Sequence, residues 1–507
     1  MTQAKTVMVQ GTGSSVGKSM MVAALCRMLR QDGYRVAPFK AQNMSLNSFV
    51  TKEGGEIGRA QAVQAEAAGI EPTVHMNPIL LKPESDCRSQ VVVRGKPWKT
   101  SAAREYWRDT AQLLDVVAES LAHLRQHYDV VVIEGAGSPA EVNLREHEIV
   151  NMRVARLAGA PVLLVGDIDR GGVFASLVGT LELLTPEERR HVKGLIINKF
   201  RGDPALLMPG VEMVEKRTGK PCLGVVPYIP DLSVAQEDGV YLDDRPEKKV
   251  AVNSVDVAVI CLPYMSNYDD FDPLGREGCS VRYVSTATEL GLPDLIILPG
   301  TKTTIADLQQ LRRSGIADAI VRRHRCGTPI IGICGGYQML GQRISDPEHV
   351  ESDEGEVAGL GLLDVYTVFE QEKRTIQVSA VVAGDSGVLA GLQGLGVEGY
   401  EIHQGSTIVV SGQPAFRIHR TPDGASDHCD GCLDNTGRVM GTYIHGLFNN
   451  EDFTVGLLTG LSGTKGNIAR RDTVEWRQRE YDRLADTVRS SLNMKAIYDI
   501  VSQGMNA

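Results

Sequence analysis

The chain has 507 residues, a formal net charge of −10, 42% hydrophobic residues and 23% charged residues. Its length predicts two or three domains, and its composition is that of a folded chain rather than a disordered one. The negative charge argues against a nucleic-acid binder that depends on bulk positive charge, and no apolar run reaches the roughly 18 residues of a membrane span. With no N-terminal targeting signal and nine scattered cysteines, we expect a cytoplasmic protein without nucleic-acid or membrane partners.

The first half of the chain alternates continuous aliphatic runs with helical stretches. Because the runs do not alternate with polar residues, they predict strands that are buried on both faces. The predicted strands are Thr6–Gln10, Arg35–Lys40, Val130–Ile133, Val162–Val165, Gly194–Asn198 and Leu223–Val226. The predicted helices are Lys18–Gln31, Arg59–Ala68 and Ala102–Gln126. Strand–helix repetition of this kind predicts an α/β fold with a doubly wound, mostly parallel sheet.

A glycine-rich loop lies between the first predicted strand and the first predicted helix. Its glycines allow the backbone to wrap a phosphate, and the loop amides together with the helix N-terminus favour anions. We expect Lys18 to reach the β- and γ-phosphates of a nucleotide and Ser19 to bind Mg²⁺. The loop is one residue longer than the common GxxxxGK[ST] pattern. The predicted nucleotide-binding residues are Gly11, Thr12, Gly13, Ser14, Ser15, Val16, Gly17, Lys18 and Ser19.

A carboxylate that completes the metal site is expected at the end of a neighbouring strand. The strand Val130–Ile133 is followed by Glu134 and then by a glycine turn. Ligands of open α/β sheets bind at the carboxyl edge of the strands. Ser19 and Glu134 are therefore the predicted Mg²⁺ ligands. The alternative is a solvated glutamate in an ordinary turn.

Polar side chains also follow three other predicted strands of the first half. They are Gln42 and Asn43, Asp169 and Arg170, and Asn198. We expect the first four on the substrate side of the site and Asn198 at the purine edge of a nucleotide. Each of these segments is equally compatible with an ordinary polar loop.

The strand–helix pattern breaks at residues 236–249, which are polar and charged. This segment predicts a domain boundary, with a first domain at 1–240, a second at 250–450 and a helical extension of the second at 451–507. The second domain begins with a new α/β series and ends in a more strand-rich region. Its predicted strands are Val255–Leu262, Val281–Ser285, Leu295–Leu298, Pro329–Ile333, Leu362–Phe369, Thr375–Val382 and Arg438–Ile444.

The strongest signal in the second half is a strand, a tight turn and a helix around Cys334. Its Gly-x-Cys-x-Gly pattern is typical of a nucleophile elbow, in which small residues permit a sharp turn that exposes the thiol. The N-terminus of the following helix favours the reactive thiolate. His445 ends an apolar strand in the same predicted domain and is the expected base. His403, two residues after Glu401, occupies a similar strand end and stays an alternative.

The segment Ile331–Gly341 resembles the nucleophile motif of class I glutamine amidotransferases, and Leu298–Gly300 resembles their oxyanion loop. This resemblance implies that Cys334 attacks glutamine and that His445 is the catalytic histidine. It also implies that the oxyanion is received at Gly300 and Gly335. The family usually places a glutamate two residues after the histidine, where this chain has Leu447. The third member of the triad is therefore open.

Taken together, both halves resemble the cobyric acid synthases along nearly the whole chain, with a phosphate loop similar to that of dethiobiotin synthetase. The resemblance implies two doubly wound domains, an N-terminal P-loop NTPase-like domain and a C-terminal class I amidotransferase-like domain. They would use ATP, Mg²⁺ and glutamine as the ammonia donor. The segments that carry the resemblance are Gly11–Ser19, Phe39–Ser48, Glu134–Leu144, Gly166–Ser176, Ile197–Asp203, Gly332–Gly341, Gly399–Gly405 and Tyr443–Phe448.

The same resemblance implies a corrinoid substrate, adenosylcobyrinic acid a,c-diamide, which is amidated at its b, d, e and g carboxylates. A polycarboxylate needs a locally basic pocket in an acidic protein, and Lys18, Lys40 and Arg170 are the candidates for it. An aspartate that binds metal in dethiobiotin synthetase is replaced near Gln42 and Asn43.

Several alternatives stay open at this point. Cobyrinic acid a,c-diamide synthase and CTP synthase share the two-domain plan, although Phe39–Ser48 and Gly166–Ser176 favour cobyric acid synthase. A non-catalytic ATP switch of the partition type is another alternative, for which Cys334 is the discriminating residue. Cys429 and Cys432 have the spacing of half a zinc site, but no second pair accompanies them, so we expect two free thiols.

Overall fold

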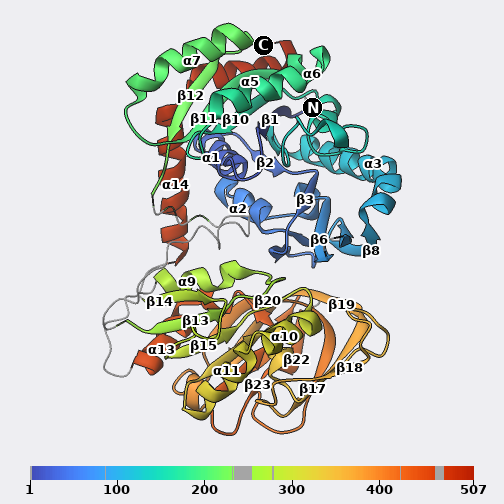
Figure 1. Cartoon of the computed structure of the whole chain (residues 1–507), viewed down its shortest axis with the longest axis vertical. Coiled ribbons are helices and arrows are strands. Elements are labelled where there is room, and N and C mark those ends of the chain that lie inside the picture. The colour runs from blue at the N-terminus through green and yellow to red at the C-terminus, as the bar shows by residue number, and fades with distance from the viewer. Residues whose placement is uncertain are drawn as a thin grey trace.

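The computed structural model of the chain describes residues 3–85, 87–230, 232, 234, 254–276, 279–422, 424–462 and 473–506. Two α/β domains lie one above the other along the long axis of the molecule (Figure 1). The domain boundary predicted at residues 236–249 lies outside the described residues. Within those residues, no helix is both long enough and apolar enough to cross a bilayer.

The first domain is built on a six-stranded sheet in which all neighbouring strands run parallel. All six strands predicted in the first half of the chain belong to it. In spatial order they are β12 (Cys222–Pro227), β11 (Val192–Phe200), β10 (Val162–Asp167), β1 (Lys5–Gly11), β9 (Val130–Glu134) and β2 (Val36–Phe39). The predicted doubly wound fold is confirmed for this domain.

Helices cover both faces of this sheet. Along β1, Val7 and Val9 join one apolar cluster and Met8 joins the cluster on the opposite face, which is why the strands are continuously apolar. The predicted bounds of the first two helices are those of the structure, and the third is displaced by one residue. The helices are α1 (Lys18–Gln31), α2 (Arg59–Ala68), α3 (Ala103–His127), α4 (Met152–Ala158), α5 (Val173–Leu183), α6 (Pro186–His191) and α7 (Pro204–Thr218).

Two small sheets, which the sequence did not reveal, lie at the edge of the first domain that faces the second (Figure 1). One has the order β3 (Gln42–Met44), β6 (Ile79–Ser85), β7 (Arg88–Val93) and β8 (Lys96–Ala102). The other is the antiparallel pair β4 (Ser48–Val50) and β5 (Glu56–Gly58). Several of these strands are short or carry polar residues, so they lack the continuous apolar runs of the main sheet.

The second domain contains a parallel sheet with one antiparallel edge strand. Its order is β14 (Ser280–Val284), β13 (Asp256–Ile260), β15 (Leu295–Leu298), β16 (Ile330–Ile333), β24 (Val439–Thr442) and β23 (Cys432–Leu433). The helices of this part are α9 (Asp272–Arg276), α10 (Thr304–Arg313), α11 (Ile316–Arg325) and α12 (Gly335–Leu340). The expected second α/β series is therefore present.

A seven-stranded sheet completes the second domain. The two predicted strands at Leu362–Phe369 and Thr375–Val382 are one long strand, β19, and the predicted strand Arg438–Ile444 is divided between β24 and β25. The strands are β17 (Arg343–Ser345), β18 (Glu356–Ala358), β19 (Val365–Val382), β20 (Gly396–Val409), β21 (Phe416–Thr421), β22 (Gly424–Asp430) and β25 (Ile444–His445). Because β25 pairs with β20, His445 lies opposite Tyr400.

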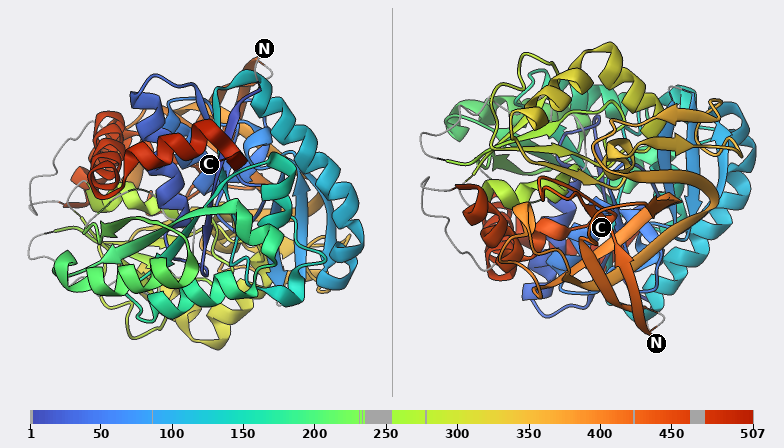
Figure 2. Two further views of the ribbon diagram at one scale, coloured as in Figure 1. Left: turned by 90° about the horizontal axis from the view of Figure 1, so that it is seen from above. Right: turned by 90° about the horizontal axis from the view of Figure 1, so that it is seen from below.

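The C-terminal helices are shared between the two domains. Helix α13 (Glu451–Ser462) packs in the core of the second domain. Helices α14 (Thr473–Ser491) and α15 (Met494–Gln503) instead join the apolar cluster of the first domain, where α14 lies beside α1 and β12 (Figures 1 and 2). This differs from the expectation that 451–507 extends the second domain. The amphipathic pattern predicts helices, but it does not tell which apolar surface they cover.

Candidate active site

The phosphate loop joins β1 to α1 at the carboxyl edge of the first sheet, as predicted. Gly17 and Ser15 have left-handed backbone conformations, with φ of 98° and 57°. The ammonium group of Lys18 donates to the carbonyl oxygens of Gly13 at 2.7 Å and Gly137 at 3.2 Å. Lys18 therefore lies over the loop, where the N-terminus of α1 provides a site for anions.

Asn198 and Lys199 support the loop from the end of β11. The Asn198 amide donates to the Val16 carbonyl oxygen at 2.9 Å, and a Cβ atom at Gly17 would lie 2.2 Å from its nitrogen. Lys199 donates to the Ser15 carbonyl oxygen at 2.7 Å. The contact of Asn198 in the structure is thus with the loop backbone, and recognition of a purine stays a prediction.

Glu134 ends β9 and is fully buried, so it is not a solvated turn residue. Its carboxylate accepts hydrogen bonds from Ser19 Oγ at 2.8 Å, from Lys40 Nζ at 3.0 Å and from the Gln64 amide. Burial alone would raise the pKa of Glu134, but Lys40 and the hydrogen-bond donors lower it. The carboxylate is therefore ionised beside the Ser19 hydroxyl.

The surroundings of Glu134 fit a magnesium ion. Ser19 and Glu134 carry oxygen atoms, the ligand type that Mg²⁺ prefers, and Mg²⁺ usually keeps several water molecules. Buried side-chain oxygens of Gln10, Gln64 and Asn151 have no hydrogen-bond partner among the described residues. They lie around Glu134 and the following glycine turn, where they can accept hydrogen bonds from such water molecules.

The four residues expected on the substrate side come from two different parts of the first domain. Gln42 accepts a hydrogen bond from the Tyr106 hydroxyl, and Asn43 is buried with its amide donating to Gln61 at 3.0 Å; both lie on β3. Gln42 and Asn43 come shortly after β2, whereas Asp169 and Arg170 follow β10. In the main sheet, β1 and β9 lie between β10 and β2.

The basic pocket expected around the substrate is also divided. Lys40 is buried and paired with Glu134 at 3.0 Å, so it lies beside the carboxylate that contacts Ser19 of the phosphate loop. Asp169, beside the third candidate Arg170, forms a partly exposed ion pair with Arg201 at 2.8 Å. Of the three predicted cations, Lys18 and Lys40 thus lie at the phosphate loop.

Cys334 lies at a strained turn between β16 and α12. Its φ of 52° and ψ of −111° are unfavourable for a side chain with a Cβ atom. The turn requires close backbone approach, because a Cβ atom at Gly336 would lie 2.0 Å from the Leu298 carbonyl oxygen. The thiol donates to the Ile402 carbonyl oxygen at 3.5 Å. This geometry is that of a nucleophile elbow.

The loop after β15 places Gly300 between the elbow and the histidine. A Cβ atom at Gly300 would lie 3.0 Å from Cε1 of His445 and 3.5 Å from Cβ of Cys334. Gly335 is the first residue of α12, directly after the elbow. The structure therefore brings together the four residues that were predicted from the sequence for glutamine hydrolysis, namely Gly300, Cys334, Gly335 and His445.

His445 is held by a carboxylate that the sequence did not reveal. Its Nδ1 lies 2.7 Å from Oδ2 of Asp270, while Oδ1 of Asp270 accepts the Gly446 N–H at 2.9 Å. Burial lowers the pKa of His445, but Asp270 and the nearby Cys334 thiol raise it well above its ordinary value. Nε2 of His445 has no hydrogen-bond partner among the described residues, so this nitrogen is available for proton transfer.

Asp270 comes from the short helix η3 (Tyr268–Phe271), 175 residues before His445. At the position where the amidotransferase family usually has a glutamate, Leu447 is buried and apolar. The only sequence signal for Asp270 was the acidic run of Asp269, Asp270 and Asp272 after the first strand of the second domain. The alternative base His403 instead stacks on Tyr443, with ring centroids 3.7 Å apart.

Comparison with known proteins covers both domains. Residues 7–242 match the CobQ/CobB/MinD/ParA nucleotide binding domain, and residues 256–453 match the CobB/CobQ-like glutamine amidotransferase domain. The cobyric acid synthase of Dehalococcoides mccartyi strain CBDB1 is 57% identical over 99% of this chain and 100% of its own length. The chain belongs to the cobyric acid synthase family. The enzyme of that name from Sorangium cellulosum is 53% identical, covering 98% of this chain and 99% of the relative.

Family membership confirms several predictions from the sequence. The chain is a glutamine-dependent amidating ligase of cobalamin biosynthesis, and its two domains have the expected fold class. It uses ATP and glutamine. The non-catalytic partition switch is thereby set aside, because the relatives match the nucleotide-binding and amidotransferase halves together.

Proposed function

We propose that this ligase amidates the b, d, e and g carboxylates of adenosylcobyrinic acid a,c-diamide. One observation supports this best: the chain contains two sites. In one, Cys334, His445 and Asp270 are buried together; in the other, Ser19 of the phosphate loop is hydrogen-bonded to Glu134. The first group suits release of ammonia from glutamine, and the second suits activation of a carboxylate by ATP. The relatives named cobyric acid synthase support the corrinoid as the acceptor.

Glutamine hydrolysis begins when the Cys334 sulfur bonds to the carboxamide carbon and the thiol proton passes to Nε2 of His445. Asp270 accepts the Nδ1–H of the imidazole at 2.7 Å and stabilises the imidazolium that forms when Nε2 takes the thiol proton, as the raised pKa of His445 indicates. Backbone N–H groups at Gly300 and Gly335 are assigned to the developing oxyanion. The imidazolium then protonates the leaving nitrogen, ammonia departs, and water cleaves the thioester to glutamate and free thiol.

Carboxylate activation takes place at the phosphate loop. The loop amides and Lys18 bind the nucleotide phosphates, and Ser19 with Glu134 would hold Mg²⁺, which neutralises phosphate charge when bound. A carboxylate oxygen of the substrate bonds to the γ-phosphorus of ATP, and ADP leaves. Ammonia then attacks the acyl carbon of this acyl phosphate, and inorganic phosphate leaves as the carboxamide forms.

The acceptor is tested with the purified chain, Mg-ATP and glutamine. Adenosylcobyrinic acid a,c-diamide, cobyrinic acid and UTP are supplied one at a time, and products are identified by mass spectrometry. We expect stepwise exchange of hydroxyl for amino groups on the a,c-diamide alone. Amidation of cobyrinic acid or UTP without amidation of the a,c-diamide would contradict the assignment.

The division of labour is tested with single variants. Cys334→Ser is expected to abolish glutamine-dependent amidation and to retain amidation with ammonium chloride. Cys326→Ser, at an exposed free thiol of the same domain, is the matched control and should retain both activities. Lys18→Ala should lose amidation with either nitrogen source, while the Cys334 thiol still reacts with an electrophilic glutamine analogue. Equal loss of both activities in Cys334→Ser would contradict the two-site assignment.

A further inference from the structure

The carboxylate that holds His445 lies in a segment that contacts the first domain. This segment, residues 266–270, leads from the turn after β13 to Asp270. Ser266 N donates to the Gly300 carbonyl oxygen at 2.9 Å, which ties the beginning of the segment to the predicted oxyanion loop. Asn267 has a φ of 52°, an uncommon conformation for a residue with a side chain. The segment thus connects two parts of the glutaminase site.

Two buried residues of the first domain, Asn47 and Ser48, hold the middle of the 266–270 segment. Oδ1 of Asn47 accepts the Tyr268 N–H at 3.2 Å, and the Ser48 N–H donates to Oδ1 of Asn267 at 2.9 Å. Asn47, Ser48 and Asn267 are each no more than 1% exposed. Buried backbone groups need such partners, so each contact fixes the segment next to Asp270.

Ser48 is also connected to His445 through Tyr400. The Tyr400 hydroxyl donates to the Ser48 carbonyl oxygen at 3.3 Å. The Tyr400 ring stacks on the His445 imidazole, with ring centroids 5.4 Å apart and an angle of 16° between the planes. The backbone of Ser48 is therefore hydrogen-bonded both to Asn267, in the segment that carries Asp270, and to Tyr400, which stacks on the imidazole.

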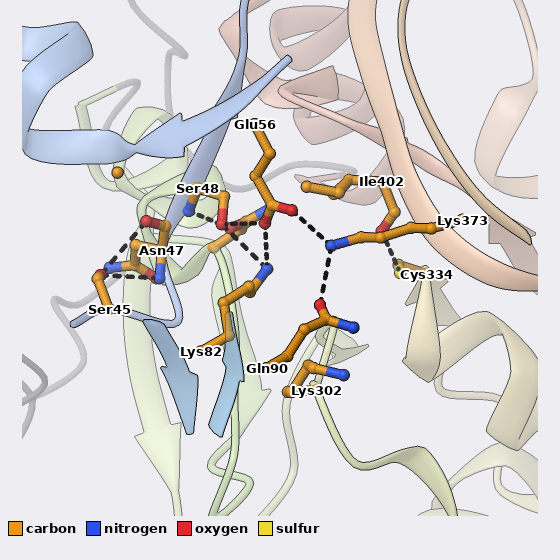
Figure 3. A network of polar contacts seen from close by, with 12 residues as sticks. Ser45, Asn47, Ser48, Glu56, Lys82, Gln90, Lys302, Cys334, Lys373 and Ile402 are labelled. Carbon is orange, nitrogen blue, oxygen red and sulfur yellow. Dashed lines mark hydrogen bonds and ion pairs between the residues drawn. The ribbon is translucent and has the colours of Figure 1, made fainter. Parts of the chain in front are cut away.

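Ser48 is itself fixed by a buried ionic cluster that spans the two domains (Figure 3). Its hydroxyl donates to Glu56 at 2.7 Å and accepts from Lys82 at 3.0 Å. Glu56 also pairs with Lys82 from the first domain and with Lys373 from the second. Burial raises the pKa of Glu56, but the two lysines lower it by more than burial raises it, so the carboxylate stays ionised. A second ion pair, between Arg59 and Asp269 at 2.7 Å, joins the domains beside Asp270.

We propose that Asn47 and Ser48 of the nucleotide-binding domain are positioning residues of the glutaminase site. They hold the 266–270 segment so that Asp270 keeps its 2.7 Å contact with Nδ1 of His445. In the second domain they contact Asn267, Tyr268 and Tyr400, which border Asp270 and His445, so we assign them an effect on proton transfer rather than on substrate binding. The proposal rests on the proposed role of Cys334 and His445 in glutamine hydrolysis.

The test compares two contacts between the same domains. Asn267→Gly removes the acceptor of the Ser48 N–H, and glycine adopts the positive φ without strain. We expect kcat for glutamine hydrolysis to fall about tenfold or more, because misplacing a catalytic group by about 1 Å costs on the order of 100-fold. The KM for glutamine and the ammonia-dependent amidation rate should stay within about twofold. The control is Gln377→Ala, which removes a 2.8 Å bond to the Val50 carbonyl oxygen and should change none of these values.

A second variant acts from the other domain. Asn47→Ala removes the acceptor of the Tyr268 N–H and should show the same loss of kcat with unchanged KM. Ammonia-dependent amidation in each preparation reports that the chain is folded. The proposal is overturned if kcat is unchanged in both variants, if ammonia-dependent activity falls equally, or if Gln377→Ala shows the same loss. A wild-type chain that does not hydrolyse glutamine would instead overturn the proposed function itself.

Discussion

Replacing Asp270 by asparagine tests the assignment of the third catalytic residue most sharply. In the structure, Oδ1 of Asp270 accepts the Gly446 N–H and Oδ2 faces Nδ1 of His445. The Gly446 N–H requires an oxygen, so the asparagine side chain should keep its oxygen there and turn its NH₂ group toward Nδ1. An NH₂ group at this place favours the tautomer with the proton on Nε2, which cannot take the thiol proton.

The expected loss follows from the geometry of the pair. The 2.7 Å contact joins two side chains that are 1% and 4% exposed, and a hydrogen bond to a charged group contributes about 1.5–3 kcal/mol. This loss corresponds to roughly 10- to 150-fold in rate. In a serine protease triad the corresponding change to the wrong tautomer lowers kcat by about 10⁴. We therefore expect Asp270→Asn to lower glutamine hydrolysis by between about 10² and 10⁴, and Asp270→Ala, which does not force that tautomer, to lower it less.

Glutamate release and ammonia-dependent amidation are measured on the same preparations. Asp256→Asn is the matched control, because Asp256 pairs with Arg282 at 2.8 Å at the beginning of β13, away from the elbow. It should leave both activities within about twofold, the range expected of a change of a few tenths of a kcal/mol. The reasoning is refuted if Asp270→Asn hydrolyses glutamine within threefold of the wild-type rate, or if both activities fall together.

Three further predictions concern the nucleotide site and the packing of the domains. Glu134→Gln should abolish ATP-dependent amidation with either nitrogen source and leave glutamine hydrolysis measurable, because Glu134 lies only at the phosphate loop; retained amidation would contradict its role as a metal ligand. Glu56→Gln leaves Lys82 and Lys373 buried without their anion, so the free energy of unfolding at pH 7 should fall by about 3–5 kcal/mol in urea titrations. The pKa of Glu56 is lowered in the folded chain, so the stability that its carboxylate contributes is fully present above the ordinary Glu pKa of about 4.5 and is progressively lost as the pH falls below that value. A Glu56→Gln loss of stability that is unchanged in acid would contradict the assignment. Leu484→Ala on α14 should destabilise the first domain by about 2–5 kcal/mol, with protease cleavage appearing first in that domain, whereas first cleavage in the second domain would contradict the observed packing.

The contacts around Ser48 suggest why the two half-reactions share one chain. Lys40, which pairs with Glu134, precedes Ser48 by only a short stretch of chain that passes through β3. The same stretch therefore begins at the phosphate site and ends on the residues around His445. In the proposed mechanism, glutamine is hydrolysed efficiently only when this part of the nucleotide-binding domain is in place.

The sequence by itself determined the parts of this protein that depend on neighbouring residues. The phosphate loop, the bounds of α1 and the six strands of the first sheet follow from local patterns of glycine and apolar residues. The elbow at Cys334 is also local, because strand, turn and helix are contiguous in the chain. His445 and Glu134 were predicted as site residues because functional groups lie at the carboxyl ends of parallel strands, and the structure places Glu134 at the end of β9 and His445 at the end of β25.

Only the tertiary structure decided which distant residues complete the sites. Asp270 meets His445 across 175 residues of sequence, and the neighbouring Asn267 and Tyr268 are hydrogen-bonded to Ser48 and Asn47 of the other domain. The helices α14 and α15 were predictable as helices, but their place on the first domain was not. The physical reason is the same in each case: a sequence pattern specifies which face of an element is apolar or charged, whereas packing determines which other surface that face meets.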